Sequence, residues 1–560
     1  MLTLAASCAL TTRFVAQQIV AQGALLADST CQVDGVPSCA SEYLLEDVLR
    51  QHWKFDADYQ YVTSDCGAVD DIFQYHNFTD SEAAAAAVAL NAGTDTDCGT
   101  AYLQLNVSVA DNQTTVARMD QALTRLYHAL FTVGYFDGSA YQSLDWSNVA
   151  TPDAQQLAYQ AAYEGMTLLK NDDAFLPLTG SRKKKVAVIG PYANATTQMQ
   201  GDYSGTPKYI HSPLSAFQNY SAWDVTYANG TAIDGNSTAG FAKAVAAAEA
   251  SDLVIYLGGI DNSLEQETLD RTTLAWPGNQ VDLINQLAAC KPVVVVQFGG
   301  GQVDDSPLLS NAGVKSVVWA GYPSQDGGNA LLDILTGKQS VAGRLPTTQY
   351  AASYNDEVSI FDINLRPNGS YPGRTYKWFT GKPTLPFGYG LHYTTFSYHW
   401  NQKLKHQYNI QHLVESCRHA DGSINDLTSF ANVSIKVSNT GRRASDYVGL
   451  LFISSTNAGP APRPNKSLVS YSRLHNIQVR GSQQLDLPLT LGSLARANTN
   501  GDLTVFPGDY EITLDTDARL TYNFSLKGQP VVIETLPAPK TNYNYTVPVH
   551  IQPPSMEAHS

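Results

Sequence analysis

Basic side chains are scarce in this sequence, which bears on the partners it could have. Of its 560 residues, 35 are Lys or Arg against 51 Asp or Glu, so the net charge is -16. Phosphate recognition needs clustered Lys and Arg. The only dense basic run, residues 182–185, directly precedes an apolar strand and is typical of a solvated strand start. We therefore expect no nucleic-acid partner.

Long apolar runs and paired cysteines are also missing. No stretch of about 18 or more residues is free of polar side chains, so we expect no membrane-spanning helix and no membrane partner. The seven cysteines are scattered and none forms a Cys-x-x-Cys pair, which argues against a disulfide framework and a zinc site. The chain is therefore expected to use no metal and no cofactor.

Signals for export disagree with one another. Residues 1–10 contain a short apolar run, but no basic residue precedes it, so they do not make a convincing signal peptide. A high density of Asn-x-Ser/Thr sequons, in contrast, indicates a secreted glycoprotein. These sequons begin at Asn77, Asn106, Asn112, Asn194, Asn219, Asn229, Asn236, Asn368, Asn432, Asn465, Asn523 and Asn544.

The first 100 residues alternate between strand and helix signals. An aromatic strand is predicted over 59–65. Thr79 and Glu82 fit a capping box ahead of an alanine-rich helix. Gly93 is predicted to end that helix in front of the short segment 94–98. The order strand, helix, strand is typical of the last units of a parallel α/β barrel or of a doubly wound sheet.

A second α/β region is predicted between about residues 186 and 345. Four β-branched runs mark its strands, at 186–189, 253–257, 293–297 and 314–319. Segments 241–250 and 277–290, the latter with Pro277 at its start, have the length of crossover helices. We expect a mostly parallel sheet with helices on both faces.

The pattern changes again after a connector at 366–396, which is rich in glycine, proline and aromatic residues. Apolar and polar residues then alternate over 433–438, and a Pro-Gly-Asp turn at 507–509 leads into another alternating run. This period of two predicts an antiparallel β-sandwich. The residues after 537 are expected to form an extended polar tail.

Two acidic sites, one at Asp65 and one in a later loop, are candidates for catalytic residues. Asp65 stands at the carboxyl end of the predicted strand 59–65, where α/β barrels place catalytic groups, although a helix cap is an alternative. A second acidic group, with Asp261, Glu265, Glu267 and Asp270, lies in the loop after the strand 253–257, and by itself this loop is better interpreted as a solvated acidic surface. The pattern alone leaves both alternatives open.

Other motifs do not support a ligand site. The glycine run 299–301 follows a strand but is not a Gly-x-Gly-x-x-Gly opening a helix, so it does not indicate nucleotide binding. Asp95 and Asp97 offer only two carboxylates, too few for a calcium site. We interpret them as structural residues.

Residues 61–68, Tyr-Val-Thr-Ser-Asp-Cys-Gly-Ala, closely resemble the nucleophile segment of glycoside hydrolase family 3, in particular its β-xylosidase branch. Further segments resemble this family in the same order, over some 500 residues. They are 34–39, 92–99, 168–171, 186–191, 201–205, 270–272, 276–280, 343–346 and 385–396.

The resemblance implies a multidomain fold: a (β/α)8 barrel, an α/β sandwich domain and a fibronectin type III-like β-sandwich. The resulting divisions are an unmatched segment 1-32, the C-terminal part of a barrel at 33-145, a linker at 146-165, the α/β sandwich domain at 166-350, a connector at 351-396, the fibronectin type III-like domain at 397-537 and a tail at 538-560.

The same resemblance implies an activity and its residues. The family removes terminal β-linked sugars with retention of configuration, and the xylosidase branch acts on xylo-oligosaccharides. Asp65 matches the nucleophile and Glu265 best matches the acid/base, with Glu267 as a less favoured alternative that could bind substrate. Cys66 resembles a residue that lines the sugar pocket, and a disulfide with Cys98 is its alternative.

The match also departs from the family. A complete barrel takes about 250 residues, whereas about 140 precede the linker here, so strands one to six have no counterpart. An open barrel edge would expose backbone groups and an apolar face, so the chain as written is predicted to be unstable or inactive. The alternatives are a sugar-binding remnant, or an exo-glycosidase such as an α-L-arabinofuranosidase or a β-glucosidase.

Overall fold

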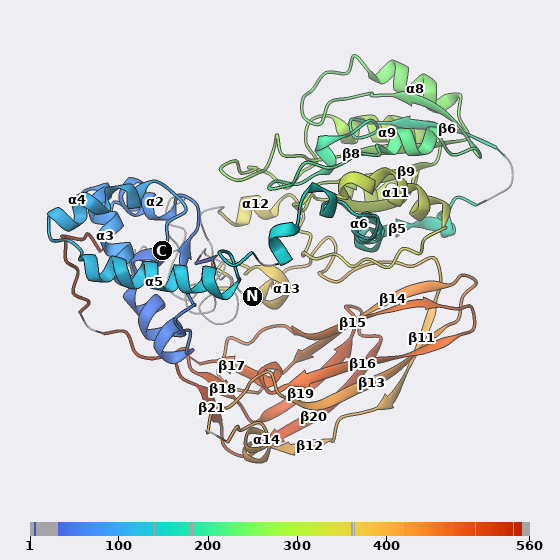
Figure 1. The fold of residues 1–560 in the computed structure, drawn as a ribbon. Coiled ribbons are helices and arrows are strands. Elements are labelled where there is room, and N and C mark those ends of the chain that lie inside the picture. Colours follow the sequence, from blue (N-terminus) through green and yellow to red (C-terminus); the bar gives the residue numbers. More distant parts are fainter. Residues whose placement is uncertain are drawn as a thin grey trace.

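The computed structural model describes residues 5–6, 32–138, 140–179, 183–359, 362, 364–420, 422–498, 500–540 and 542–551. Three parts follow one another along the chain (Figure 1). We name them the N-terminal part (32–138), the α/β part (152–349) and the β part (396–534). The segment 350–395 connects the last two.

The N-terminal part is mainly helical. Its helices are η2 (Ser38–Ala40), the π-helix η3 (Tyr43–His52), α2 (Ala68–Gln74), α3 (Glu82–Ala92), η4 (Ala101–Gln104), α4 (Leu105–Ala110) and α5 (Val116–Thr132). Its strands are β2 (Gln32–Val33), β3 (Val36–Pro37) and β4 (Thr63–Ser64), the last of which pairs in parallel with β1 (Ala5–Ala6). Turns η5 (Ala140–Ser143) and η6 (Trp146–Asn148) lead to the α/β part.

Two local predictions for this part need correction. The predicted strand 59–65 is reduced to two residues, and segment 94–98 contributes one parallel bridge, from Thr96 to Thr63. Helix α3 is capped by Ser81, whose hydroxyl accepts the backbone N–H of Ala84, and not by Thr79. The predicted stop at Gly93 is confirmed, because its positive φ of 124° ends the helix.

Helix α3 is the centre of the N-terminal part. Almost every residue of this alanine-rich helix is buried, which explains why its sequence has no polar face. The neighbouring helix α5 differs, because Leu123, Tyr127 and Phe131 are exposed on it. Tyr135 and Phe136, just beyond its end, extend this apolar surface. The N-terminal part therefore exposes an apolar surface along α5 and just beyond its end.

The α/β part has a six-stranded sheet in the order β5-β10-β9-β8-β6-β7. Its strands are β5 (Thr167–Asn171), β6 (Lys184–Ile189), β7 (Trp223–Ala228), β8 (Leu253–Gly259), β9 (Val293–Phe298) and β10 (Val314–Gly321). Every pairing is parallel except that of β5 with β10, so the predicted mostly parallel sheet is confirmed. Strands β8 and β9 are buried along their whole length, since helices cover both faces.

Helices on the two faces complete this part (Figure 1). They are α6 (Pro152–Gly165), α7 (Pro213–Gln218), α8 (Phe241–Glu249), α9 (Gln280–Cys290), α10 (Ser306–Ser310) and α11 (Gly327–Thr336), with turns η7 (Asp172–Ala174), η8 (Thr197–Met199) and η9 (Ser324–Asp326). The predicted helix 277–290 begins only at Gln280. Gly278 has a φ of +55°, so the chain turns there before the helix starts.

The connector contains two short helices, α12 (Tyr354–Glu357) and α13 (Thr375–Trp378). The β part follows, with α14 (Ile410–Ser416), η10 (Leu491–Leu494) and β11 (Phe396–Gln402), β12 (Gln407–Asn409), β13 (Ser429–Asn439), β14 (Ser445–Ser454), β15 (Ser467–Ile477), β16 (Ser482–Thr490), β17 (Ala495–Ala497), β18 (Leu503–Val505), β19 (Gly508–Leu514), β20 (Leu520–Lys527) and β21 (Val531–Glu534).

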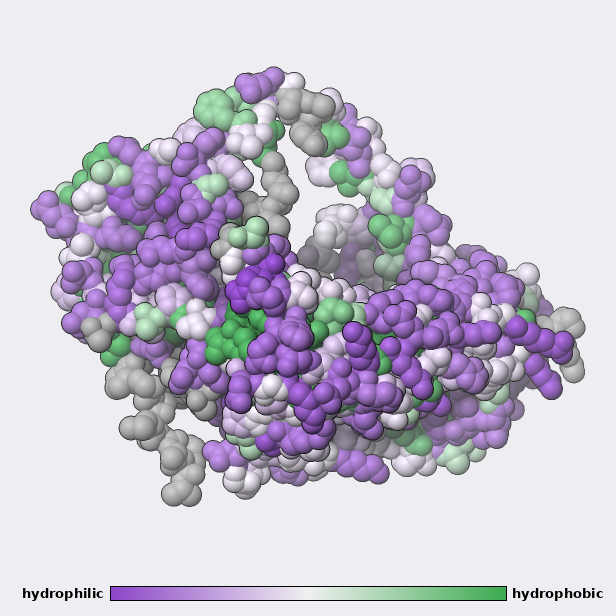
Figure 2. All heavy atoms as spheres, turned by 90° about the horizontal axis from the view of Figure 1, so that it is seen from below, coloured by the Kyte–Doolittle hydropathy of each residue, from purple (hydrophilic) through white to green (hydrophobic). Residues whose placement is uncertain are grey.

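These strands form sheets of three, five and three strands, antiparallel except for the pair β12 and β20. The predicted alternation in β13 is confirmed for Val433, Ile435 and Val437, which are buried in the core, whereas Lys436 is exposed. Seen from below, hydrophilic side chains cover most of the face, and hydrophobic residues gather in smaller patches (Figure 2). The period-two prediction thus describes this part correctly.

The tail beyond residue 537 returns to the N-terminal part (Figure 1). Lys540 forms ion pairs with Glu42 at 2.8 Å and Asp47 at 3.0 Å. Val549 forms an antiparallel bridge with Thr79. The tail is extended as predicted, and it joins the first and last parts of the chain.

A fully buried carboxyl group lies behind the sheet of the α/β part. Asp305 accepts hydrogen bonds from the indole of Trp276 at 3.1 Å and from the amide of Gln349 at 3.0 Å. Burial raises its pKa to about 7, and the nearby charge of Asp304 acts in the same direction. The folded state therefore holds a proton here more tightly than the unfolded chain does.

We expect Asp305→Asn to flatten the pH dependence of stability. The stability that comes from the proton on Asp305 is fully present below about pH 4 and falls as the pH rises to about 7, where the loss levels off at on the order of 4 kcal/mol. In the Asp305→Asn variant, the new amide group can donate to the side-chain carbonyl oxygen of Gln349. This oxygen is buried and has no hydrogen-bond partner among the described residues. Urea unfolding at pH 4 to 8 measures this, with the exposed Asp282→Asn as control. Parallel curves for Asp305→Asn and the unmutated chain would contradict it.

Candidate active site

Asp65 follows strand β4 and is exposed. One of its carboxylate oxygens accepts the backbone N–H of Cys66 at 2.8 Å. Gly67, with a φ of +81°, then turns the chain into α2, and its N–H donates to the carbonyl oxygen of Cys98 at 2.7 Å. The carboxylate is thus presented to solvent at the end of a short strand, in a loop fixed by backbone contacts.

Cys66 and Cys98 form a disulfide with a Cα–Cα distance of 4.3 Å. This is the alternative to a free pocket-lining thiol that the sequence left open. Ser64 adds a second link between the two segments, because its hydroxyl donates to Asp97 at 3.2 Å and accepts the N–H of Cys98 at 2.9 Å. Any contact of Cys66 with a ligand, which stays a prediction, would involve the disulfide sulfur.

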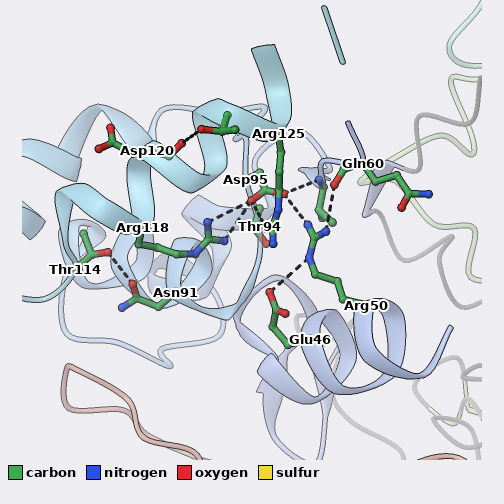
Figure 3. A network of polar contacts seen from close by, with 12 residues as sticks. Glu46, Arg50, Gln60, Asn91, Thr94, Asp95, Thr114, Arg118, Asp120 and Arg125 are labelled. Atoms are coloured by element: carbon green, nitrogen blue, oxygen red, sulfur yellow. Dashed lines mark hydrogen bonds and ion pairs between the residues drawn. The ribbon is translucent and has the colours of Figure 1, made fainter. Parts of the chain in front are cut away.

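A buried carboxylate holds the strand that precedes Asp65 (Figure 3). Asp95 accepts the N–H of Val62 at 3.0 Å. Three guanidinium groups surround the same carboxylate: Arg50 at 2.7 Å, Arg125 at 2.9 Å and Arg118 at 3.2 Å. Asp95 is therefore a structural anchor that joins η3 and α5 to the strand, which agrees with its interpretation as a structural residue.

No local pattern in the sequence indicates this cluster, because its arginines lie 23 to 45 residues from Asp95. The spacing of Arg118 and Arg125, which places both on one face of α5, is the nearest hint. Asp97, in the same segment, accepts the N–H of Tyr102 at 3.1 Å, and burial raises its pKa. Both aspartates thus face protein donors.

Glu265 is half-buried in the loop after β8, and donors occupy both its carboxylate oxygens. Arg271 donates to one oxygen from its Nε at 2.7 Å, and the backbone N–H of Gly301 donates to the other at 2.7 Å. The predicted loop therefore positions Glu265 precisely, unlike a solvated acidic surface.

Glu267 is more exposed than Glu265. Its carboxylate accepts a hydrogen bond from the hydroxyl of Tyr203, and its backbone N–H donates to Asp202 at 3.0 Å. The segment 201–205, noted above for its sequence, thus lies against the loop that carries both glutamates. Among the contacts of the described residues, none joins Asp65 to either glutamate.

The glycine run after β9 is part of this site. A Cβ atom added to Gly301 would lie 2.4 Å from both oxygens of Glu265 and 2.7 Å from Arg271. Only glycine lets the backbone approach the carboxylate so closely. The glycine run, which does not fit a nucleotide-binding loop, thus serves to bring the backbone N–H of Gly301 to Glu265.

Tyr322 was missed by the sequence analysis. It packs against Gly201 and Gly300, and its hydroxyl is buried beside the backbone of Gly300. Burial, with the charge of Glu265 acting in the same direction, raises its pKa to about 12. Its hydroxyl therefore stays protonated at neutral pH and is a donor in the neighbourhood of Glu265.

One group of side chains in the described part of the chain has the spacing of a metal site. Ligand atoms of Glu164, Asp446 and His475 lie within 4.8 Å of one another. Arg473, however, contacts Glu164 at 3.3 Å and Asp446 at 3.2 Å. Its guanidinium already neutralises these carboxylates, so we interpret the group as a polar contact between the α/β and β parts.

Among the helices described, none has the length and apolar character needed to cross a membrane.

Family models match two regions of the chain. They are the N-terminal domain of glycosyl hydrolase family 3 over residues 17–129 and the C-terminal domain of the same family over residues 166–393. The first match begins inside segment 1–32, for which the motifs provided no counterpart.

The sequence is also similar to curated proteins. A probable exo-1,4-β-xylosidase of Aspergillus terreus is 51% identical over 516 residues, and a second, from Aspergillus niger, is 45% identical over 517 residues. The chain spans 66% and 64% of the length of these relatives, while they match 91% and 90% of it. This chain thus spans slightly less than two thirds of the length of each relative.

Solved structures show the same relationship. A family 3 exo-β-xylosidase in complex with a xylobiose aziridine activity-based probe is 43% identical with a TM-score of 0.87, covering 91% of this chain and 66% of that one. A β-glucosidase of Erythrobacter marinus is 28% identical with a TM-score of 0.75, covering 89% and 67%. The fold described above is therefore shared with both proteins.

Proposed function

We propose, because this chain belongs to glycoside hydrolase family 3, that it carries the catalytic carboxylates of a retaining exo-β-xylosidase, which releases terminal β-D-xylose from xylo-oligosaccharides. The observation that carries the proposal is the likeness, at 43% identity and a TM-score of 0.87, to an exo-β-xylosidase bound to a xylobiose-derived probe. The relatives at about half identity, which are probable exo-1,4-β-xylosidases, support the same substrate.

In this proposal Asp65 is the nucleophile and Glu265 the acid/base. Asp65 attacks the anomeric carbon while Glu265 protonates the leaving oxygen, and Glu265 then takes a proton from the water that hydrolyses the covalent intermediate. The contacts of Glu265 with Arg271 and Gly301 hold its carboxylate in one position. Glu267 is the alternative for this role, or a substrate contact.

The proposed carboxylates belong to different parts of the chain. Asp65 follows β4 in the N-terminal part, and Glu265 follows β8 in the α/β part. Retaining enzymes hold the two carboxyl groups about 5 Å apart. The position of the N-terminal part against the α/β part is therefore part of the catalytic geometry. We also propose that residues 33–145 are the C-terminal part of a (β/α)8 barrel and residues 397–537 a fibronectin type III-like domain.

A fusion that supplies the barrel tests the function. In this fusion, the part of the Aspergillus terreus relative that precedes its match to residue 33 is joined to this chain. The fusion and the chain alone are then assayed on aryl glycosides. We expect the fusion to cleave aryl β-D-xyloside, the Asp65→Asn fusion to be inactive, and the chain alone to stay at background.

Three results would point elsewhere. Faster cleavage of aryl α-L-arabinofuranoside or aryl β-D-glucoside by the folded fusion would contradict the xylosidase assignment. Binding of xylo-oligosaccharides without turnover would favour a sugar-binding protein. Xyloside cleavage by the chain alone would contradict the expectation that it is inactive.

The close approach at Gly301 gives a second test. Gly301→Ala places a methyl group against both oxygens of Glu265, so we expect the fusion to lose about 10- to 100-fold in kcat on aryl xyloside. Gly205→Ala is the matched control, because a Cβ there meets nothing within 4 Å. Equal activity of the two variants would show that the position of Glu265 does not limit the reaction.

We further propose that the protein is secreted and glycosylated. Of the twelve sequon asparagines, eleven are exposed and Asn432 is half-buried, so oligosaccharyltransferase could modify them before or after folding. A loss of mass when the protein from its native source is treated with an N-glycanase tests this, and an unchanged mass would contradict it.

A further inference from the structure

A cavity of about 490 Å³ lies where the connector meets the β part. One wall comes from the connector, with Arg366 and helix α13. The other walls come from the loop between β14 and β15, from β17 and from β19. The six side chains most relevant to its chemistry are Arg366, Lys377, Trp378, Arg463, Arg496 and Tyr510. None of the residues discussed for the candidate active site lines it.

The lining carries an excess of positive charge. Four of its residues, Arg366, Lys377, Arg463 and Arg496, are basic, whereas Asp426 is its only acidic residue among those described. The chain as a whole has the opposite balance, with a net charge of -16. Within the described part of the protein, none of the four basic groups has a carboxylate oxygen within 4.0 Å. The lining of the cavity therefore contains four basic side chains that have no carboxylate partner among the described residues.

Two of these cations hold the cavity together. Arg463 donates to the carbonyl oxygen of Gly459 at 2.9 Å, and Arg496 donates to those of Pro460 at 2.9 Å and Ala458 at 3.1 Å. Burial lowers the pKa of Arg496, and the charges of Arg463 and Arg366 add to this effect. These groups repel one another across the cavity, so an anion between them would be stabilised.

The other two cations are available to a ligand. The guanidinium of Arg366 lies 5.2 Å from the ring centre of Trp378, which orients it without neutralising it. The ammonium group of Lys377 has no polar contact among the described residues, and burial lowers its pKa. A carboxylate bound in the cavity beside Lys377 would restore the interactions that its ammonium group lost with water.

The walls are fixed before any ligand binds. Asn465 donates its backbone N–H to the carbonyl oxygen of Lys377 at 2.7 Å and its side-chain amide to that of Phe379 at 2.9 Å. Leu468 donates its N–H to the hydroxyl of Tyr376 at 3.2 Å. These bonds join the loop that carries Arg463 to the helix that carries Lys377, so little conformational entropy is lost on binding.

Apolar side chains, such as Leu427, Ile453 and Leu468, line much of the rest of the cavity. Neutral hydrogen-bonding groups lie among them, from Ser454, Ser455, Ser467, Thr490, Ser493 and Asn498. Hydroxyl and amide groups beside an aromatic ring and paired cations suit a ligand that carries both hydroxyl groups and a carboxylate. The volume falls within the range of about 300–1,000 Å³ that is usual for small-molecule sites.

We propose that this cavity binds an oligosaccharide through a uronic acid residue, whose carboxylate interacts with the basic groups of the lining, which include Arg366 and Lys377. The choice of a sugar rests on the proposed function, whereas the preference for an anion rests on the cavity alone. Because the cavity lies outside the α/β and N-terminal parts, it would retain acidic xylo-oligosaccharides at a place separate from Asp65 and Glu265.

Calorimetric titration of the full chain carrying Asp65→Asn tests the proposal without turnover. The probes are a xylo-oligosaccharide with one glucuronic acid branch, the same compound with its carboxyl group reduced to an alcohol, and inorganic phosphate. We expect the acidic sugar to bind at one site, the reduced sugar at least tenfold more weakly, and added salt to weaken only the first. Arg366→Ala and Lys377→Ala should each lower its affinity about tenfold.

Lys382→Ala is the matched control, because this lysine is exposed on the same connector and does not line the cavity. Circular dichroism establishes that each variant is folded, and Lys377→Glu, which reverses the charge, should abolish binding. Equal binding of the acidic and reduced sugars, or unchanged binding by the Arg366 and Lys377 variants, would overturn the proposal. Binding of phosphate but not of the acidic sugar would overturn the choice of ligand.

These outcomes do not depend on hydrolysis. If the fusion cleaves no xyloside but the acidic sugar still binds and responds to Arg366→Ala, the proposed function fails while the cavity assignment stands. If xyloside is cleaved but the acidic sugar does not bind, the reverse holds.

Discussion

Asp95→Asn is expected to lower the free energy of unfolding of the N-terminal part by about 3–5 kcal/mol. The Asp95 side chain is fully buried and is shared by Arg50, Arg118 and Arg125 (Figure 3). An asparagine of the same shape would leave the buried Arg50 and the half-buried Arg118 and Arg125 without this carboxylate, although Glu46 lies 3.4 Å from Arg50. Breaking a buried ion pair by removing one partner costs more than the pair itself contributes, because the remaining charges stay desolvated.

Hydrogen exchange of α3 measures this effect locally, since other parts of a multidomain chain can unfold separately. Asp120→Asn is the matched control, because Asp120 is an exposed carboxylate on the helix that carries Arg118 and Arg125. We expect faster exchange for Asp95→Asn and no change for Asp120→Asn. Exchange at the unmutated rate in both variants would mean that the arginines find water or Glu46 at no cost.

The sequence predicted the α/β and β parts well because their signals are local. Runs such as 293–296 are apolar throughout, and the strand they belong to is covered on both faces. In β13 the alternation of Val433, Ile435 and Val437 with polar neighbours follows from a sheet with one buried face. In both cases the period of the pattern depends only on residues within one strand.

The N-terminal part was predicted less accurately because its order depends on distant residues. The segment 59–65 has strong strand propensity, yet only two residues form β4, since few backbone partners lie beside it. Propensity cannot supply those partners. The arginines around Asp95, the pairing of Cys66 with Cys98 and the donors to Glu265 are likewise contacts across 6 to 45 residues, which no local pattern encodes.

The roles of the carboxylates can be separated by chemical rescue in the fusion described above. We expect Glu265→Ala to lower kcat on xylobiose by about 10²- to 10⁴-fold. Aryl xylosides with a very acidic phenol should be affected far less, since such a leaving group needs no proton. Asp65→Ala should lose roughly 10⁴-fold or more on both substrates, because the covalent step itself is blocked.

Azide should then distinguish the two variants by product. In Glu265→Ala it attacks the xylosyl ester of Asp65, displacing the carboxylate, so β-xylosyl azide forms and the rate rises. In Asp65→Ala it enters the space of the missing nucleophile and displaces the leaving group directly, so α-xylosyl azide forms. Nuclear magnetic resonance of the products separates the anomers, and the opposite anomers would contradict the assigned roles.

Glu267→Ala completes the comparison, because Glu267 lies two residues away in the same loop but is exposed and contacts Tyr203. We expect this variant to change KM more than kcat and to show no response to azide. The reason is geometric: Glu265 is fixed by Arg271 and Gly301, each at 2.7 Å, and a proton donor must hold its position through both steps. If Glu267→Ala instead shows the leaving-group dependence and the β-azide product, the acid/base is Glu267, and the contacts of Glu265 serve only to order the loop.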